Sequence, residues 1–226
     1  MKKSFNRRHF LAAAGSATVV AAPAAFAAPT PGKSLKIIGI SCSPRQGMTT
    51  AAAVQEALDA AKGVDPRIET ELIDLGGLSI AGWSPKPPED DFVAILPKLQ
   101  DPAVAGLIVG SPSYFRGFSS LCKAFIERCA PLREPRMLLD GKPVGAIATG
   151  GFRNGGQERV IDEIHTAMMC FGMVPVGGRP PAFMGGTLVS ADDRIDGDEL
   201  GLTTARNTGA RVADFALLRP GAGGKQ

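Results

Sequence analysis

Three segments of this 226-residue chain are almost entirely apolar, and amphipathic helical patterns separate them. They are residues 35–41, 104–110 and 144–149. A strand of this kind is buried on both faces, as happens in parallel sheets that carry helices on either side. The alternation therefore predicts an α/β fold, because parallel strands are joined through helical crossovers.

Two further strands and four helices complete the expected pattern. The strands are 67–73 and 173–176, and the helices, marked by apolar residues at helical spacing, are 49–61, 119–129, 157–171 and 203–218. Residues 74–103 are less regular and rich in Pro, Gly and acidic residues. Together these elements predict one domain over residues 35–218, built on a three-layer, doubly wound, five-stranded parallel sheet.

The first 27 residues have the layout of an export signal. A basic start containing Arg7-Arg8 precedes a run of small apolar residues, and Ala27 closes an A-x-A cleavage pattern. The arginine pair resembles a twin-arginine signal, with an ordinary secretory signal as the alternative. We expect cleavage after Ala27 and a periplasmic or otherwise exported protein, with the Tat translocase as partner of the precursor. Residues 28–34 are expected to form a linker and residues 219–226 a flexible tail.

The charge balance argues against a nucleic-acid partner. The whole chain carries a formal net charge of +3, but the four basic residues of the expected signal supply +4 of it. The remainder is therefore close to neutral and lacks the basic surface that binds phosphate backbones. No later segment is apolar over the length of a membrane span, so we expect the mature protein to be soluble.

Cysteine and histidine are too sparse to predict a metal site or a disulfide scaffold. The chain has four Cys and two His. Cys122 and Cys129 lie seven residues apart on one expected helix and are interpreted as core residues, and His165 as a structural residue. The acidic run 192–199 lacks the spacing of a calcium loop and is expected to be solvated.

The loop 41–50 joins the first expected strand to the first expected helix. Free backbone N–H groups and the helix dipole favour an anion at such a helix start. Hydroxyl groups and a guanidinium suit a phosphate. The side chains concerned are those of Ser43, Arg45, Thr49 and Thr50. The alternative is that the Ser and Thr residues only cap the helix.

Two more loops follow strands of the expected sheet. Residues 110–119 include two Phe and the only Tyr of the chain, Tyr114, which could border a flat ring system or form a core aromatic cluster. Residues 149–157 contain four Gly, which allow a ligand to approach the backbone closely. Ligands bind at the carboxyl ends of strands in doubly wound sheets, so the three loops are the expected site.

Jointly, the three loops resemble those of the flavodoxin-like NADPH-dependent FMN reductases, nearest to the iron–sulfur flavoproteins and their relatives without a cluster. The matching segments are Ser43-Pro44-Arg45, Gly110-Ser111-Pro112-x-Tyr114-Phe115 and residues 148–158. The resemblance implies a flavodoxin-like sheet with the strand order 2-1-3-4-5. It also implies FMN as cofactor.

The same resemblance assigns roles to individual residues. It implies that the FMN phosphate is held by Ser43, Arg45, Thr49 and Thr50. It implies that the flavin ring is bordered by Pro112, Ser113, Tyr114, Phe115 and Gly117, and on the opposite rim by Thr149, Gly150, Gly151 and Gly156. In this family the flavin carries the reaction, so no catalytic side chain is expected.

The sequence departs from the family pattern in several places. No Cys occurs between Cys42 and Cys122, so we expect no iron–sulfur cluster in the loop after the second strand. That loop instead carries the only Trp, Trp83, which either covers the flavin or a partner or packs on the surface. Cys42 replaces a usual Gly, and Arg116 replaces a small residue and adds positive charge near the flavin.

The expected function is that of an exported FMN-binding oxidoreductase. By resemblance, it takes electrons from an NAD(P)H-type donor, passes them to a quinone, a flavin or another small acceptor, and forms a homo-oligomer. Nicotinamide dinucleotides are not expected outside the cytoplasm, which raises a second hypothesis, an electron carrier that serves a redox protein in the periplasm. A third hypothesis is a scaffold that has lost its cofactor.

Overall fold

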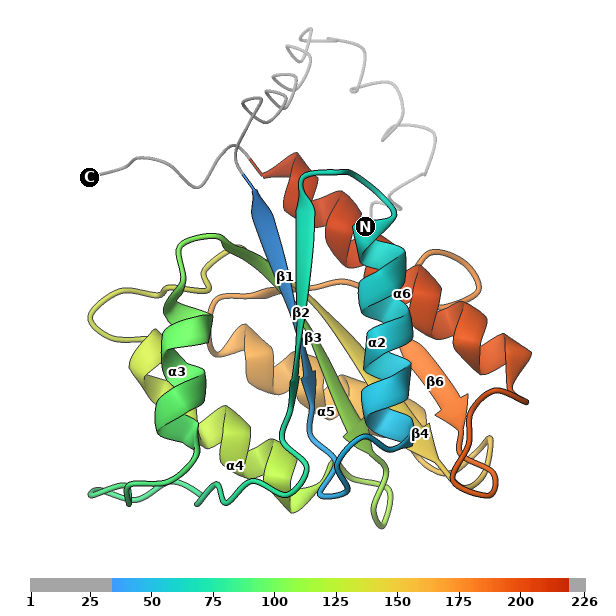
Figure 1. Ribbon diagram of the computed structural model, residues 1–226, viewed down its shortest axis with the longest axis horizontal. Helices are drawn as coiled ribbons and strands as arrows, with labels where there is room; N and C mark the ends of the chain where they lie inside the picture. Colours follow the sequence, from blue (N-terminus) through green and yellow to red (C-terminus); the bar gives the residue numbers. More distant parts are fainter. Residues whose placement is uncertain (1–33, 220–226) are drawn as a thin grey trace, which may run out of the picture.

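The computed structural model describes residues 34–219. The expected signal peptide, nearly all of the linker and nearly all of the tail lie outside the described residues. The described chain forms one sheet with helices on both faces (Figure 1). This arrangement is the three-layer α/β architecture that the alternating pattern predicts.

All strand pairs of the sheet are parallel. The strands are β1 (Leu35–Ser41), β2 (Ile68–Asp74), β3 (Val104–Pro112), β4 (Pro143–Gly150), β5 (Val174–Pro175) and β6 (Gly186–Val189). Their order, β2-β1-β3-β4-β5, confirms the expected one. A sixth strand was not expected: β6 pairs with the carboxyl end of β4, from Ile147↔Gly186 to Gly150↔Val189. It lengthens the edge of the sheet where the loops of interest lie.

Two helices cover one face and three cover the other (Figure 1). The first pair is α2 (Thr49–Lys62) and α6 (Glu199–Leu218), and the other three are α3 (Phe92–Gln100), α4 (Ser120–Arg128) and α5 (Gln157–Met169). Every residue of β3 and β4 is buried between these layers. Cys122 and Cys129 lie in the core on the side of α4, as expected.

One helix was not expected, a second begins earlier than expected, and a third is capped differently. Helix α3 lies in the segment taken as irregular, where Pro97 obscures a pattern of buried Phe92, Ile95 and Leu99. Helix α6 starts earlier than expected, because the Asp198 side chain accepts from Gly201 N and caps it. Helix α2 is preceded by Met48, which makes no side-chain cap, so neither of its first two threonines is the cap residue.

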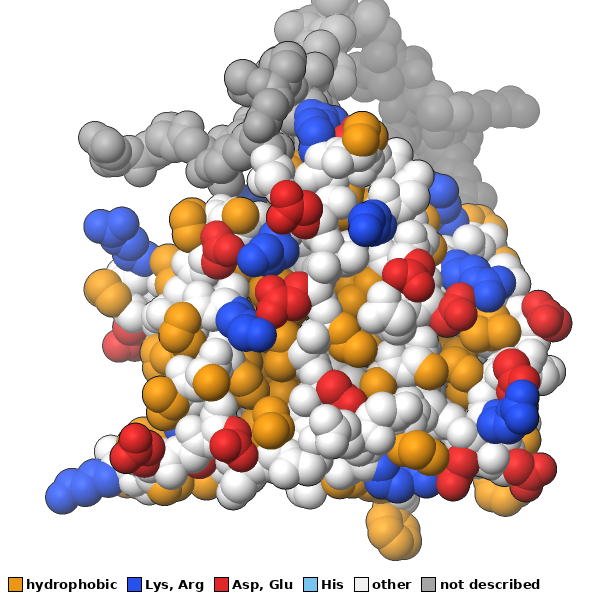
Figure 2. All heavy atoms as spheres, in the orientation of Figure 1, with side chains coloured by type: hydrophobic (Ala, Val, Ile, Leu, Met, Phe, Trp, Pro, Cys, Tyr) orange, Lys and Arg blue, Asp and Glu red, His pale blue; other side chains and the backbone are white. Residues whose placement is uncertain are grey.

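The surface is chemically mixed. Figure 2 shows acidic, basic and hydrophobic side chains interspersed over one face, without an extended area of a single charge. Within residues 34–219, no helix combines the length and the apolar character needed to cross a membrane.

Candidate functional site

The three loops singled out in the sequence meet at the carboxyl edge of the sheet, the lower edge in Figure 1. Ser119 Oγ donates to Cys42 O at 2.6 Å and joins the first loop to the second. Ser113 joins the second loop to the third: its N–H donates to Thr149 O and its Oγ to Gly155 O, both at 2.7 Å. The loops therefore form one connected structure.

The loop between β1 and α2 presents the start of a 14-residue helix. Ala52 N is the first amide bonded back along the helix, to Met48 O at 3.0 Å, so the amides of the first turn have no intrahelical partner. No acidic residue lies in that turn. Ser43 and Thr49 are buried here, and Ser43 Oγ accepts from Arg45 N at 3.2 Å. The helix start therefore offers donors to an anion.

Two buried threonines connect this helix to the end of β4. Thr50 Oγ1 and Thr149 Oγ1 lie 2.8 Å apart, and both residues are at most 2% exposed. One hydroxyl donates to the other, so the accepting hydroxyl keeps a proton that it can donate to a third group. Nearby at the end of β1, Ser41 Oγ is buried without a hydrogen-bond partner. Such unused hydrogen-bonding capacity is typical of a ligand site.

Asp74, at the end of β2, holds this loop in shape and was not singled out in the sequence. Its carboxylate accepts from Gly47 N at 2.6 Å and from Gly76 N at 3.2 Å. A side chain at Gly76 would collide with the backbone of Gln46. An acidic residue at a strand end, followed after one residue by Gly76-Gly77, is the signal that could have indicated this role.

The loop after β3 ends in a tight turn that exposes aromatic side chains. Tyr114 and Gly117 bond to each other through both backbone pairs. Phe115 and Arg116, the central residues, have φ values of 51° and 66°, which is the pattern of a type I′ turn. Phe115 is fully exposed and Tyr114 42% exposed, so neither belongs to a core aromatic cluster. Pro112, in contrast, is buried in β3.

The glycine-rich loop after β4 packs directly against that turn. Gly156 has φ +98°, and a Cβ there would lie 2.8 Å from the Cα of Arg116. A Cβ on Gly150 would lie 2.8 Å from Gln157 Nε2, whereas Gly151 faces open space. Arg116 Nη1 donates to Asn154 O at 3.3 Å. Gly156 is therefore required by its positive φ and by close packing against backbone, whereas at Gly150 the nearest atom is the end of a side chain.

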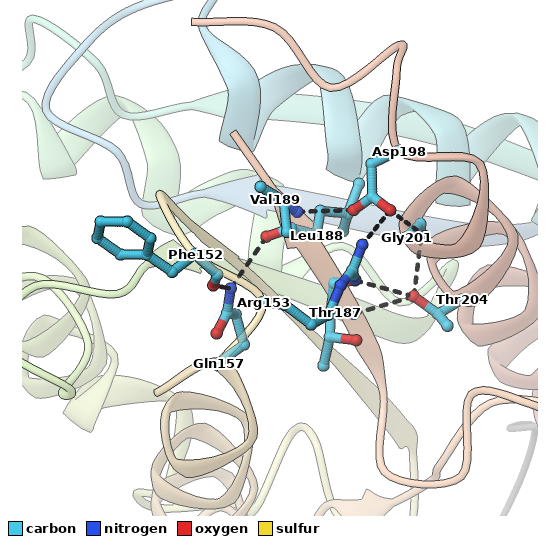
Figure 3. A network of polar contacts seen from close by, with 9 residues as sticks. All are labelled: Phe152, Arg153, Gln157, Thr187, Leu188, Val189, Asp198, Gly201 and Thr204. Carbon is cyan, nitrogen blue, oxygen red and sulfur yellow. Dashed lines mark hydrogen bonds and ion pairs between the residues drawn. The ribbon is translucent and has the colours of Figure 1, made fainter. Parts of the chain in front are cut away.

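A polar network supports the outer side of the site (Figure 3). Gln157 Nε2 donates to Phe152 O at 2.5 Å and to Leu188 O at 3.3 Å, while its Oε1 is buried without a partner. Arg153 donates to Thr187 O at 3.1 Å and pairs with Asp198.

Asp198 was expected in a solvated loop, but it is buried. Burial alone would raise its pKa, yet hydrogen bonds from Val189 N, Gly201 N and Arg153 outweigh that effect and lower the pKa. Asp198 is therefore a charged carboxylate whose hydrogen bonds hold the segment between β6 and α6 in place.

Residues 35–184 match the model of a protein family described as NADPH-dependent FMN reductase. The chain belongs to this family. The family assignment confirms the resemblance seen in the sequence and makes the protein an FMN-dependent oxidoreductase. The helix start with free amides and the unused threonine proton fit a cofactor with a phosphate, and the exposed Tyr114 and the open space at Gly151 fit a flat ring.

Similar proteins agree with the family. An iron–sulfur flavoprotein of Methanocaldococcus jannaschii is 40% identical over 195 residues, which cover 81% of this chain and 98% of that protein. An NAD(P)H dehydrogenase (quinone) of Paracoccus denitrificans is 32% identical over 74% of this chain and 86% of that protein. The fold is shared with a WrbA-like flavodoxin from Agrobacterium tumefaciens, at a TM-score of 0.56 and 18% identity, covering 82% of this chain and 98% of that one.

The region in which an iron–sulfur cluster was considered carries other residues. Trp83 is 65% exposed, and its backbone N–H donates to Glu127 Oε2 at 2.7 Å, which anchors this loop on α4. It borders a groove of about 710 Å³ that Phe118 and Phe171 also line. Among the described residues, no group of three or more His, Cys, Asp or Glu side chains is arranged to hold a metal ion.

Proposed function

We propose that this protein transfers electrons from an NAD(P)H-type donor, through FMN, to a quinone or another small acceptor outside the cytoplasm. The single observation that carries the proposal is the joining of three loops, each matching the family, into one site at the carboxyl edge. Two relatives named NAD(P)H dehydrogenase (quinone), at 32% and 30% identity, support the donor and the acceptor class. The arginine pair near the start of the chain supports export.

In this proposal the described residues bind and orient the cofactor. Bound FMN supplies the redox chemistry of the site. The free amides at the start of α2, the guanidinium of Arg45 and a hydroxyl of the Thr50–Thr149 pair donate to the phosphate end. Tyr114 and the glycine-rich loop border the ring and restrict access of water to one side.

An electron carrier is the second candidate. Phe115 is fully exposed and Phe152 is 79% exposed, and they lie on the two loops assigned to the ring. Exposed aromatic side chains at the rim of a redox site suit docking of a protein partner. An exported protein would also lack the dinucleotide donors of the cytoplasm. In this case a redox protein would take the place of NAD(P)H or of the small acceptor.

The deciding experiment is an anaerobic absorption spectrum of the purified mature protein, before and after addition of NADPH and then of a soluble quinone. We expect flavin bands near one FMN per chain that bleach within seconds and return with the quinone. Bands that persist with NADPH but bleach with dithionite would favour the carrier. A colourless protein that takes up no added FMN would overturn both candidates.

A further inference from the structure

Arg45, assigned to the phosphate, is held by a residue from a distant part of the chain. Its Nη1 lies 2.5 Å from Asp193 Oδ1, although 148 residues separate the two. Arg45 belongs to the loop between β1 and α2, and Asp193 to the segment between β6 and α6. The pair therefore connects the two outer ends of the site across the carboxyl edge of the sheet.

Asp193 is placed by a rigid turn. Ala191 and Arg194 bond to each other through both backbone pairs, at 3.0 and 2.8 Å. The two residues between them, Asp192 and Asp193, have φ values of 48° and 58°, the pattern of a type I′ turn, which Asp and Asn tolerate.

This turn is itself fixed to the sheet on both sides. Before the turn, Ser190 N donates to Gly150 O at 2.8 Å. After the turn, the buried Asp198 accepts from Val189 N at 2.7 Å and pairs with Arg153. The position of the Asp193 carboxylate is therefore determined by β4, β6 and the start of α6.

The geometry of the pair leaves donors of Arg45 free. A guanidinium has five N–H groups in a planar fork, and the Asp193 contact uses Nη1. The Tyr114 side chain is a second polar neighbour of this guanidinium. The Arg45 side chain is nevertheless 47% exposed, so part of its donor set faces solvent and is open to a ligand. A fixed guanidinium loses less conformational entropy when it binds a phosphate than a freely rotating one.

We propose that Asp193 is a positioning residue for the phosphate end of FMN: its carboxylate holds Arg45 so that the free guanidinium donors face the phosphate. The proposal rests on the proposed function, because it takes FMN as the ligand of this loop. Asp193 itself need not touch the cofactor. A carboxylate that competed with the phosphate for Arg45 would instead weaken binding, and the experiment separates the two effects.

The test compares Asp193→Asn with Asp192→Asn in the full mature protein. Asn keeps the turn, because it tolerates positive φ. Asp192 is the matched control, being the other central residue of the same turn. We expect Asp193→Asn to bind FMN two- to fivefold more weakly, the range for an exposed ion pair, and to release it correspondingly faster. Asp192→Asn should match the wild type. FMN fluorescence quenching and stopped-flow release give the two quantities.

A double-mutant cycle identifies the route of the effect. In an Arg45→Ala background, Asp193→Asn should change FMN affinity no further, because the residue acts through Arg45. The difference between wild type and Asp193→Asn should also shrink at high salt, which screens an exposed pair. An equal loss in both backgrounds would show a purely structural role and overturn the proposal.

The remaining outcomes are also informative. Tighter FMN binding by Asp193→Asn would show that the carboxylate competes with the phosphate, and unchanged binding would show that it does not position Arg45. Either result overturns this inference alone, because the wild type still binds FMN. A wild type without FMN affinity, or Arg45→Ala with full affinity, would instead overturn the phosphate assignment on which the inference rests.

Discussion

The Thr50 and Thr149 hydroxyls lie 2.8 Å apart, although 99 residues separate them in the chain. The contact joins the first turn of α2, assigned to the phosphate, to the end of β4, where the sequence assigns Thr149 to a rim of the flavin ring. The short distance places the Thr149 hydroxyl at the phosphate end as well. Because both residues are buried, each depends on the other for a hydrogen bond. The same hydrogen bond therefore stabilises the fold and sets which hydroxyl can donate a proton to a ligand in the site.

Replacing one member of this pair should lower the free energy of unfolding by more than the net contribution of one hydrogen bond. Thr50→Val keeps the shape but leaves Thr149 Oγ1 buried without a partner, which costs about 1–2 kcal/mol of unfolding free energy. The double variant Thr50→Val, Thr149→Val removes both polar groups and should be closer to the wild type in stability than the sum of the single variants. Both variants should bind FMN more weakly. Urea unfolding and FMN titration measure the two effects, and additive stability losses would contradict the coupling.

The two glycines Gly156 and Gly151 should respond differently to alanine. Gly156→Ala introduces a Cβ at φ +98° and 2.8 Å from the Cα of Arg116, so the turn after β3 and the glycine-rich loop must separate. We expect a loss of about 1–3 kcal/mol in stability and weaker FMN binding. Gly151→Ala meets nothing within 4 Å and is the control. Equal FMN affinity in the two variants would show that FMN binding does not depend on this close packing.

Much of the site could be predicted because its residues lie in loops after apolar strands. The apolar runs of β1, β3 and β4 showed where these strands end. The positions of Ser43, Ser113 and Gly150 at one edge then followed from the rule for parallel sheets. The family resemblance then assigned roles that spacing alone left open. Short elements were less accessible: β6 has four residues and is held by pairing with β4, not by a strong local pattern.

Two residues missed in the sequence, Asp74 and Asp193, each have a partner that is distant in sequence. Asp74 bonds to Gly47, 27 residues earlier, and Asp193 pairs with Arg45 across 148 residues. In the sequence, Asp193 and Asp198 belong to a charged run that is typical of a solvated loop. Only the pairing of β6 with β4 brings that run to the site, so neither composition nor local spacing could indicate it.

The pH dependence of stability should contain a contribution from His165. Burial lowers its pKa to about 4, and Nε2 has no hydrogen-bond partner. In the unfolded chain the imidazole titrates near 6.5, so between pH 6.5 and 4 the unfolded state binds a proton that the folded state does not. Stability is therefore lost as the pH falls through this window. We expect His165→Gln to remove roughly 1–2 kcal/mol of the loss between pH 7.5 and 5. Urea unfolding at the two pH values checks this, and an unchanged pH slope would contradict it.

The arginine pair at the start of the chain makes the last prediction, on residues outside the described part of the structure. Replacing Arg7 and Arg8 by Lys keeps the positive charge, so an ordinary secretory signal would continue to work. A twin-arginine signal depends on the guanidinium pair, and its precursor should then accumulate uncleaved inside the cell. Cell fractionation with mass determination distinguishes the precursor from a mature chain that begins at Ala28. Export of the variant at the wild-type level would assign the chain to the general secretory route. Wild-type protein that stays in the cytoplasm with an intact N-terminus would contradict the export proposal. It would also remove the argument against NAD(P)H as donor.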